Sequence, residues 1–142
     1  MDGDGASELL VLSANQVLMY SGSTGNLLEF YNLPGTSGAG GLDPVQALPD
    51  MTGDGVPEIG VGERYYSGGL SDNWGRFLIF DGSTKHIVLE VLGDLDRYNF
   101  GSAFTVLPDL DQDGVIDFAI CADLGIPTGS TERSGTVHII SG

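Results

Sequence analysis

The residues best placed to do chemistry lie in short Asp-rich loops that recur along the chain. The most complete loop runs from Asp109 to Asp117, with Gly114 at its position 6 and aspartates at positions 1, 3, 5 and 9, namely Asp109, Asp111, Asp113 and Asp117. Glycine lets such a loop reverse, so the carboxylates converge, and the carbonyl of Val115 at position 7 can join them. Ca²⁺ takes about six to eight oxygen ligands at ~2.3–2.6 Å. The loop therefore predicts a calcium site.

Two other loops repeat this pattern with weaker ligand sets. The middle loop offers Asp50, Thr52, Asp54, the carbonyl of Val56, and Glu58. Thr52 puts a neutral hydroxyl where a carboxylate is expected, so we predict weaker binding there. The first loop offers Asp2, Asp4, the carbonyl of Ala6, and Glu8. Its position 1 ligand would precede Met1, so we expect an empty or partly occupied site. The sequence thus predicts two to three calcium sites.

An EF-hand, a magnesium site and a plain turn each fit these loops less well than a calcium site between strands. An EF-hand needs a loop of about 12 residues that ends in Glu and lies between helices, whereas here the closing acid comes at position 9 between strand-like segments. Mg²⁺ prefers strict octahedral geometry and retained water. Plain turns are also rich in Asp and Gly, but three loops that share one spacing favour a metal.

The elements that position these loops are short strands arranged in repeats. Three turn glycines, Gly22, Gly82 and Gly142, are spaced 60 residues apart. Between turns the apolar residues fall in short, often alternating runs, which predict strands rather than helices. The expected strands, called A to D within each repeat, are 8–13, 16–20 and 27–31; 44–49, 58–63, 76–80 and 86–92; and 101–107, 117–122 and 136–140.

Four antiparallel strands in each of several repeats are typical of a β-propeller blade. We predict an all-β fold of about two and a half blades, forming one propeller segment over 1–142 with repeats 1–40, 41–98 and 99–142. Closed propellers need about four to eight blades. Either the chain is a fragment of a longer protein, which its start inside a loop favours, or several copies complete a ring.

Composition excludes several classes of function. The chain has 20 acidic and five basic residues among 142, for a net charge of −15, which opposes binding to the phosphates of nucleic acid. No apolar run approaches the ~20 residues of a membrane span. The two histidines, His86 and His138, lie in expected strands without a nucleophile at informative spacing. We expect no enzymatic activity and no cofactor other than Ca²⁺.

A second group of residues is predicted to lie at the opposite end of the blades from the calcium loops. The group comprises four of the five basic residues, which are Arg64, Arg76, Arg97 and Arg133, and the aromatic residues Tyr65, Tyr66, Trp74 and Tyr98, in the B–C and D–A connections and at the start of one strand C. Arginine and aromatic side chains on loops of a rigid scaffold often bind a protein or glycan partner. The alternative is that these side chains pack between neighbouring blades.

At the acidic loops the chain resembles the FG-GAP repeat family, whose best-known members are the N-terminal propellers of integrin α subunits. Phe100-Gly101 opens the third repeat as the motif requires, while the second has Gly41-Leu42 and the Gly-Ala-Pro element is degenerate at 62–64 and 121–123. These departures place the chain outside the integrins proper, closer to bacterial surface or secreted members. The resemblance implies an extracellular setting, adhesion or recognition, and structural calcium.

Three functions remain open at this point. The first is an adhesion or recognition module stabilised by calcium. The second is a non-catalytic scaffold domain of a larger secreted enzyme. The third is a structural subunit that assembles through its open blade edges, because unpaired strands invite pairing with another chain.

Overall fold

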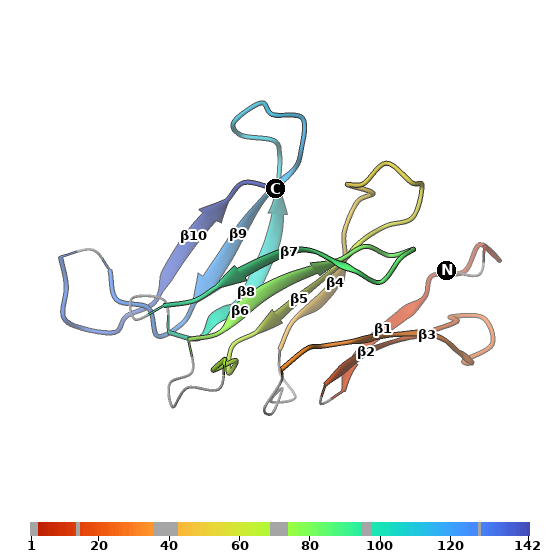
Figure 1. The fold of residues 1–142 in the computed structure, drawn as a ribbon, viewed down its shortest axis with the longest axis horizontal. Helices are drawn as coiled ribbons and strands as arrows, with labels where there is room; N and C mark the ends of the chain where they lie inside the picture. The colour runs from red at the N-terminus through yellow and green to blue at the C-terminus, as the bar shows by residue number, and fades with distance from the viewer. Residues whose placement is uncertain (1–2, 14, 36–42, 69–73, 95–97, 128) are drawn as a thin grey trace.

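The computed structural model describes residues 3–13, 15–35, 43–68, 74–94, 98–127 and 129–142. Regular structure in these residues consists of β-strands in three antiparallel sheets that lie side by side without closing into a ring (Figure 1). The first sheet contains β1 (Leu9–Ser13), β2 (Gln16–Tyr20) and β3 (Leu27–Asn32). The second contains β4 (Val45–Ala47), β5 (Ile59–Glu63), β6 (Arg76–Phe80) and β7 (Ile87–Leu92). The third contains β8 (Phe100–Leu107), β9 (Asp117–Ala122) and β10 (Thr136–Ile140).

The predicted all-β, partial-propeller fold is confirmed. Strands pair with their neighbours in sequence, in the orders β1-β2-β3, β4-β5-β6-β7 and β10-β9-β8. The repeats also share an irregularity, because the register shifts at Met19/Tyr20 in the first sheet and at Ile79/Phe80 in the second. The first and second sheets are therefore copies of the same hairpin-connected blade.

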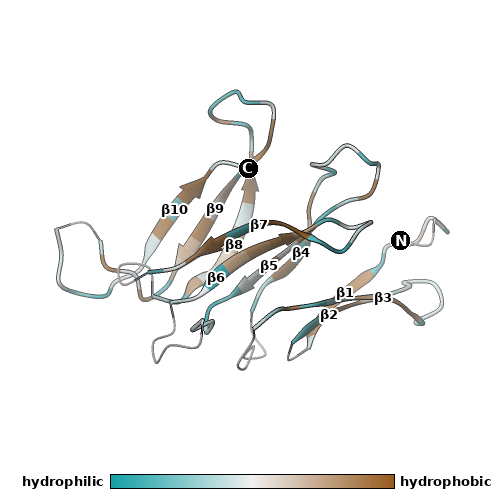
Figure 2. Cartoon of the chain, viewed as in Figure 1, coloured by the Kyte–Doolittle hydropathy of each residue, from teal (hydrophilic) through white to brown (hydrophobic). Residues whose placement is uncertain are grey.

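The core lies between the sheets rather than within any one of them. The first and second sheets share a cluster made of Val17, Met19, Tyr31, Leu33, Ile59, Val61, Leu78 and Phe80. The second and third share a cluster made of Leu48, Phe77, Ile79, Phe100, Phe118, Ile120 and Ala122. Alternate residues of β6 enter the two clusters, so this apolar strand is buried on both faces (Figure 2). Burying each large side chain contributes about 1.5–3 kcal/mol, so the middle blade is the centre of stability.

The connections separate into two ends, as expected for consecutive antiparallel strands. The β4–β5 and β8–β9 loops, which contain the acidic motifs, project from one end together with the β2–β3 and β6–β7 turns (Figure 1). The β5–β6 and β9–β10 connections leave the other end (Figure 1). This arrangement places the middle and third acidic loops at one end of the blades and the described parts of the β5–β6 and β9–β10 connections at the other.

The outer faces of the two terminal sheets expose apolar side chains. In the first sheet Leu9 is 60% exposed and Phe30 is 46% exposed. In the third, Val137 and Ile139 on β10 are 62% and 57% exposed. In the middle sheet β5 and β6 are buried between the neighbouring sheets, whereas β7 exposes Val88 and Leu92, at 48% and 53%. No helix among the described residues is long and apolar enough to cross a membrane.

Candidate metal centre

The third acidic loop, between β8 and β9, brings three of its predicted ligands together. Carboxylate oxygens of Asp109, Asp111 and Asp117 all lie within 4.8 Å of one another. Asp117 begins β9 and is only 2% exposed, while Asp111 is exposed. One oxygen of Asp117, Oδ2, accepts the backbone N–H of Leu110 at 2.7 Å. The other, Oδ1, is buried without a hydrogen-bond partner among the described residues.

Backbone hydrogen bonds hold this loop in shape. Asp109 accepts N–H groups through both oxygens, from Gln112 at 2.6 Å and from Gly114 at 2.9 Å. Asp113 Oδ1 accepts the N–H of Val115 at 2.8 Å. Gln112 and Gly114 adopt φ of 65° and 96°, a left-handed region that glycine enters freely and other residues rarely. The sequence predicted the reversal at Gly114 but not the one at Gln112.

The middle loop, between β4 and β5, has the same framework and a different closing acid. Asp50 accepts the N–H groups of Gly53 at 2.6 Å and Gly55 at 2.8 Å. Glu58 is fully buried, and its two oxygens accept the N–H groups of Met51 at 2.9 Å and Thr52 at 3.1 Å. Glu58 therefore anchors the loop with both oxygens, where Asp117 leaves one oxygen unused.

The first loop is described only in part. Asp2 lies outside the described residues. Asp4 Oδ1 accepts the N–H of Ala6 at 2.8 Å, the bond that Asp54 makes to Val56 and Asp113 makes to Val115 in the other loops, each at 2.8 Å. The position 5 aspartate thus has the same local geometry in all three repeats.

Excess negative charge characterises the middle and third loops. Among the described residues, the ion pairs formed by arginine and lysine involve acids outside these two loops. Their carboxylates are instead held by neutral N–H and O–H donors. Oxygen ligands that converge, carry net charge and include a buried oxygen without a partner suit a hard divalent cation. The donor set in the third loop therefore fits Ca²⁺.

Sequence reasoning missed one element of this centre, the turn between β6 and β7. Ser83 Oγ donates a hydrogen bond to Asp54 Oδ2, and Ser23 in the β2–β3 turn donates to Asp4 Oδ2. The Ser-Thr pair that follows both Gly22 and Gly82 was visible in the sequence. Nothing in the sequence pattern alone showed that this turn touches the acidic loop.

Similarity to known proteins indicates what kind of protein these repeats resemble. No family model matches the chain. Over 126 residues the chain is 29% identical to integrin alpha-5 of Xenopus laevis, a match that covers 82% of the chain and 11% of the relative. Over 132 residues it is 28% identical to integrin alpha-V of Gallus gallus, covering 89% of the chain and 12% of the relative. The chain is thus distantly similar to integrin α subunits over most of its length.

This likeness agrees with the FG-GAP resemblance of the acidic loops and with the observed blades. The integrin α-like chain spans roughly a tenth of the length of the curated relatives it matches. Neither relative carries the name of an enzyme. A bacterial source stays a prediction.

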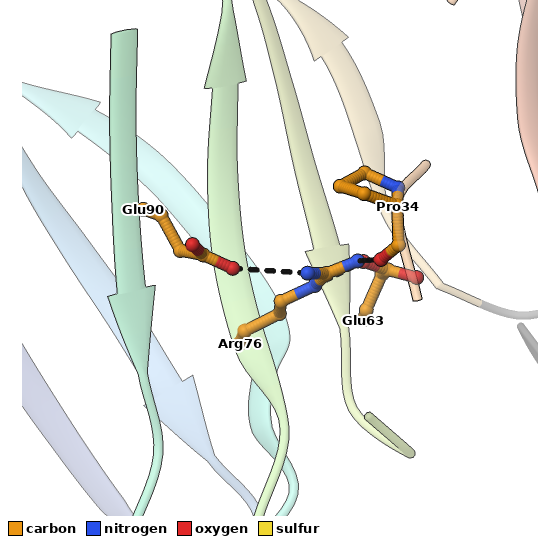
Figure 3. Close-up of polar contacts among 4 residues, drawn as sticks. All are labelled: Pro34, Glu63, Arg76 and Glu90. Atoms are coloured by element: carbon orange, nitrogen blue, oxygen red, sulfur yellow. Dashed lines mark hydrogen bonds and ion pairs between the residues drawn. The ribbon is translucent and has the colours of Figure 1, made fainter. Parts of the chain in front are cut away.

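At the opposite end of the blades, arginines pair with acids inside the integrin α-like segment. The Arg76 side chain is 2% exposed and that of Glu63 is 3% exposed; Arg76 Nε lies 2.5 Å from Glu63 Oε2. Arg76 also contacts Glu90 at 2.9 Å and donates to the carbonyl of Pro34 at 2.6 Å (Figure 3). Its guanidinium carbon lies 3.7 Å from the ring centroid of Tyr66. Arg76 and Tyr66 thus pack mainly within the middle blade, with the carbonyl of Pro34 as the contact from outside it.

Arg64 is also held by ion pairs with acids of this chain. Its Nε lies 3.0 Å from Asp43, and its Nη1 lies 3.7 Å from Asp123 in the third repeat. Its side chain is 18% exposed, whereas Tyr65 beside it is 40% exposed. Arg64 thus connects the B–C loop of the middle blade to its neighbour.

The remaining predicted recognition residues lie apart from this network. Arg133 is exposed and stacks over the ring of Tyr98, with its guanidinium carbon 3.6 Å from the ring centroid. Trp74 is half-buried and lines a pocket of about 250 Å³ together with Tyr66 and Leu92. Arg97 lies outside the described residues. A partner-binding role for these side chains stays a prediction.

Proposed function

We propose that this chain is a calcium-binding segment of a β-propeller that acts in extracellular adhesion or in recognition of a protein or glycan. The observation that carries the proposal is the third acidic loop. Three of its carboxylates converge within 4.8 Å, and a buried oxygen of Asp117 has no hydrogen-bond partner in the described part of the chain. A buried carboxylate oxygen without a partner is unfavourable, so a bound cation would stabilise this loop.

The proposed ligand set follows from the spacing of the motif, and the converging oxygens of Asp109, Asp111 and Asp117 support it in the third loop. In the third loop Asp109, Asp111, Asp113, the carbonyl of Val115, and Asp117 would hold the ion. In the middle loop Asp50, Thr52, Asp54 and the carbonyl of Val56 would do so more weakly, because Thr52 is neutral and Glu58 already accepts two N–H groups. The first loop would use Asp4, the carbonyl of Ala6, and Glu8, with Asp2. Bound Ca²⁺ would supply charge neutralisation and cross-linking, not catalysis.

Isothermal titration calorimetry of the whole chain with CaCl₂ tests this proposal. We expect the wild-type chain to bind Ca²⁺ in preference to Mg²⁺. Asp111→Asn removes one exposed ligand charge and should abolish the tighter phase of binding. Glu132→Gln removes one charge from an exposed loop far from the motifs and serves as the matched control. Equal Ca²⁺ binding by wild type and Asp111→Asn would contradict the assignment of the third loop.

Recognition by the integrin α-like segment is the second part of the proposal. The similarity to integrin alpha-5 and alpha-V supports a role in adhesion, and hence an extracellular location. With Arg64 and Arg76 engaged in ion pairs, the exposed stack of Arg133 on Tyr98 and the surface around Tyr65 and Trp74 are the candidates for partner contact. Replacing Tyr98 and Arg133 by alanine should leave thermal stability nearly unchanged and weaken partner binding.

A structural role in assembly is also supported by a specific observation. Both terminal sheets expose apolar faces, through Leu9 and Phe30 at one end and Val137 and Ile139 at the other, whereas β5 and β6 of the middle sheet are buried between its neighbours. We propose that further blades cover these faces, from the rest of a longer chain or from other copies. Analytical ultracentrifugation tests the second source: association that Val137→Glu disrupts supports it, and a monomer at all concentrations contradicts it.

A further inference from the structure

The β6–β7 turn contacts the middle acidic loop through a serine hydroxyl. Ser83 Oγ donates to Asp54 Oδ2, across 29 residues of sequence. The other oxygen of Asp54 accepts the N–H of Val56 at 2.8 Å. The carboxylate at position 5 is therefore held from two sides, by its own loop and by the neighbouring turn. Ser23 holds Asp4 in the same way in the first repeat, so the contact is a repeated feature.

A glycine at the start of each turn allows this approach. A Cβ atom on Gly82 would lie 2.0 Å from the carbonyl oxygen of Pro57, at position 8 of the middle loop. At Gly22 and Gly142 a Cβ atom would lie 1.8 Å and 2.1 Å from the equivalent carbonyl oxygens of Ser7 and Ile116. Such distances are far inside van der Waals contact, so only glycine fits. The 60-residue spacing of these glycines thus marks where each turn packs on its acidic loop.

The turn is rigid enough to position the serine. Asp81 Oδ1 accepts the backbone N–H groups of Ser83 at 2.8 Å and Thr84 at 2.7 Å, and it lies 2.9 Å from Ser83 Oγ. The backbone hydrogen bond from Thr84 is the largest of the effects that lower the pKa of Asp81. Because a hydroxyl has one proton, Ser83 can donate to Asp54 or to Asp81 at any moment, and both carboxylates keep it in place.

The same turn contacts the first blade. The Tyr31 hydroxyl on β3 donates to the carbonyl of Gly82 at 3.0 Å, and Lys85 forms an ion pair with Glu29, also on β3. The turn between β6 and β7 therefore lies between the middle acidic loop and the neighbouring sheet. The turn that positions the Asp54 carboxylate therefore also forms part of the interface between the first and second blades.

We propose that Ser83 is a positioning residue for the middle calcium site, and that the β6–β7 turn couples this site to docking of the first blade. The inference rests on the proposed calcium function. A partner that orients a ligand carboxylate typically contributes about 10- to 100-fold to metal affinity. Because the middle loop has the weaker ligand set, its occupancy depends strongly on this orientation.

Calcium titration followed by ¹H–¹⁵N NMR of the whole chain tests the positioning role. The amides of Gly55 and Gly114 report separately on the middle and third loops. We expect Ser83→Ala to weaken the Gly55 response about tenfold and to leave the Gly114 response unchanged. Ser83→Thr keeps the hydroxyl and should restore the affinity. Ser130→Ala, which removes an exposed serine hydroxyl from the β9–β10 connection, is the matched control.

The outcomes separate this inference from the proposed function. Suppose that the wild-type chain binds Ca²⁺ at both loops and that Ser83→Ala binds Ca²⁺ at the middle site with the wild-type affinity. This result would overturn the positioning role and leave the calcium function intact. Absence of any wild-type response at Gly55 would overturn both for the middle loop, while Gly114 would still decide the third. A calcium-free melting temperature of Ser83→Ala close to that of wild type is expected, because the proposed role is toward the ion.

Hydrogen exchange tests the coupling to the first blade. Calcium should slow amide exchange in β3 of the wild-type chain, and Ser83→Ala should require correspondingly more calcium for the same protection. Tyr31→Phe removes the hydroxyl that reaches Gly82 and should reduce the calcium-dependent protection of β3 without changing the Gly114 response. The coupling would be overturned if calcium shifts the Gly55 amide signal but leaves the rate of amide exchange in β3 unchanged.

Discussion

The two ends of the middle blade handle buried carboxylates in opposite ways. At the end with the B–C loop, Glu63 is buried against the guanidinium of Arg76, and Asp43 is paired with Arg64. At the calcium-loop end, Glu58 is equally buried, but it accepts only backbone N–H groups. At one end the buried acids pair with arginines, whereas the acids of the middle and third loops at the other end form no ion pair with arginine or lysine among the described residues. On the proposed function, the end with the acidic loops is the one that would depend on an ion from solution.

The largest effect is expected from removing the internal cation. Arg76→Met leaves Glu63 buried without its partner, which typically costs about 3–5 kcal/mol of the free energy of unfolding. Urea denaturation should show the same loss with calcium and with chelator, because this end does not use the ion. The double variant Arg76→Met/Glu63→Met should recover much of the stability. A loss of stability that appears only in chelator would contradict the conclusion that the end with Arg76 is independent of calcium.

Amide substitution of the acid at position 9 distinguishes the middle acidic loop from the third. Asp117→Asn removes the carboxylate with an unpaired buried oxygen, so we expect it to abolish calcium-dependent stabilisation at the third loop. At a calcium concentration 100 times Kd that stabilisation is about 2.7 kcal/mol. Glu58→Gln instead turns an amide donor toward a backbone N–H and should destabilise the chain by roughly 1–3 kcal/mol with or without calcium.

Thermal denaturation of both variants in calcium and in chelator measures this contrast. The control is Glu132→Gln, which removes a charge without touching either loop. Equal destabilisation by Asp117→Asn in the two buffers would mean that the third loop, like Glu58, has a purely structural acid.

A smaller effect is expected from giving the middle loop its missing charge. Thr52→Asp restores a carboxylate at position 3, and ligand charge tunes calcium affinity, so the Gly55 site should bind about tenfold more tightly. In chelator the variant should be slightly less stable than wild type because of added repulsion. The reverse change, Asp111→Thr, should weaken the third loop by a similar factor. Unchanged affinity in both variants would show that position 3 does not face the ion.

Much of this arrangement could be predicted from local sequence. The expected strands match the observed ones within two residues at each boundary, because alternation and Gly-rich turns are properties of a few neighbouring residues. The acidic loops were found for the same reason. All of their predicted ligands among the described residues lie in one short segment per loop.

Contacts between elements that are distant in sequence could not be predicted in this way. Arg76 looked like a surface residue at the start of a strand, yet the linker carbonyl of Pro34 and the ring of Tyr66 enclose it. Ser83 looked like an ordinary turn residue until the turn was seen against Asp54. Both depend on how one element packs on another that is distant in sequence, and one sequence shows no pairing of that kind.

The smallest expected effect is a difference in pH response between the two ends. Burial, its largest cause, raises the pKa of Glu63 above the ordinary 4.5, with Arg76 opposing the shift. Between pH 4.5 and this raised pKa the folded state binds more protons than the unfolded state, so the Glu63 contribution to stability grows as pH falls. Asp81 at the calcium end has the opposite sign. Its pKa lies below 3.8, so its contribution is complete above pH 3.8 and is lost as pH falls further.

Urea denaturation in calcium-free buffer from pH 7 to pH 3 isolates each group by difference. As pH falls toward 4.5, wild type should gain stability relative to Glu63→Gln, because the variant cannot take up the proton. Below pH 3.8, wild type should lose its advantage over Asp81→Asn, because protonation removes an acceptor of the N–H groups of Ser83 and Thr84. For each variant the measured quantity is the difference in free energy of unfolding from wild type. If this difference changes with pH in the same direction for both variants, the two ends of the blade do not differ in how they hold their acids.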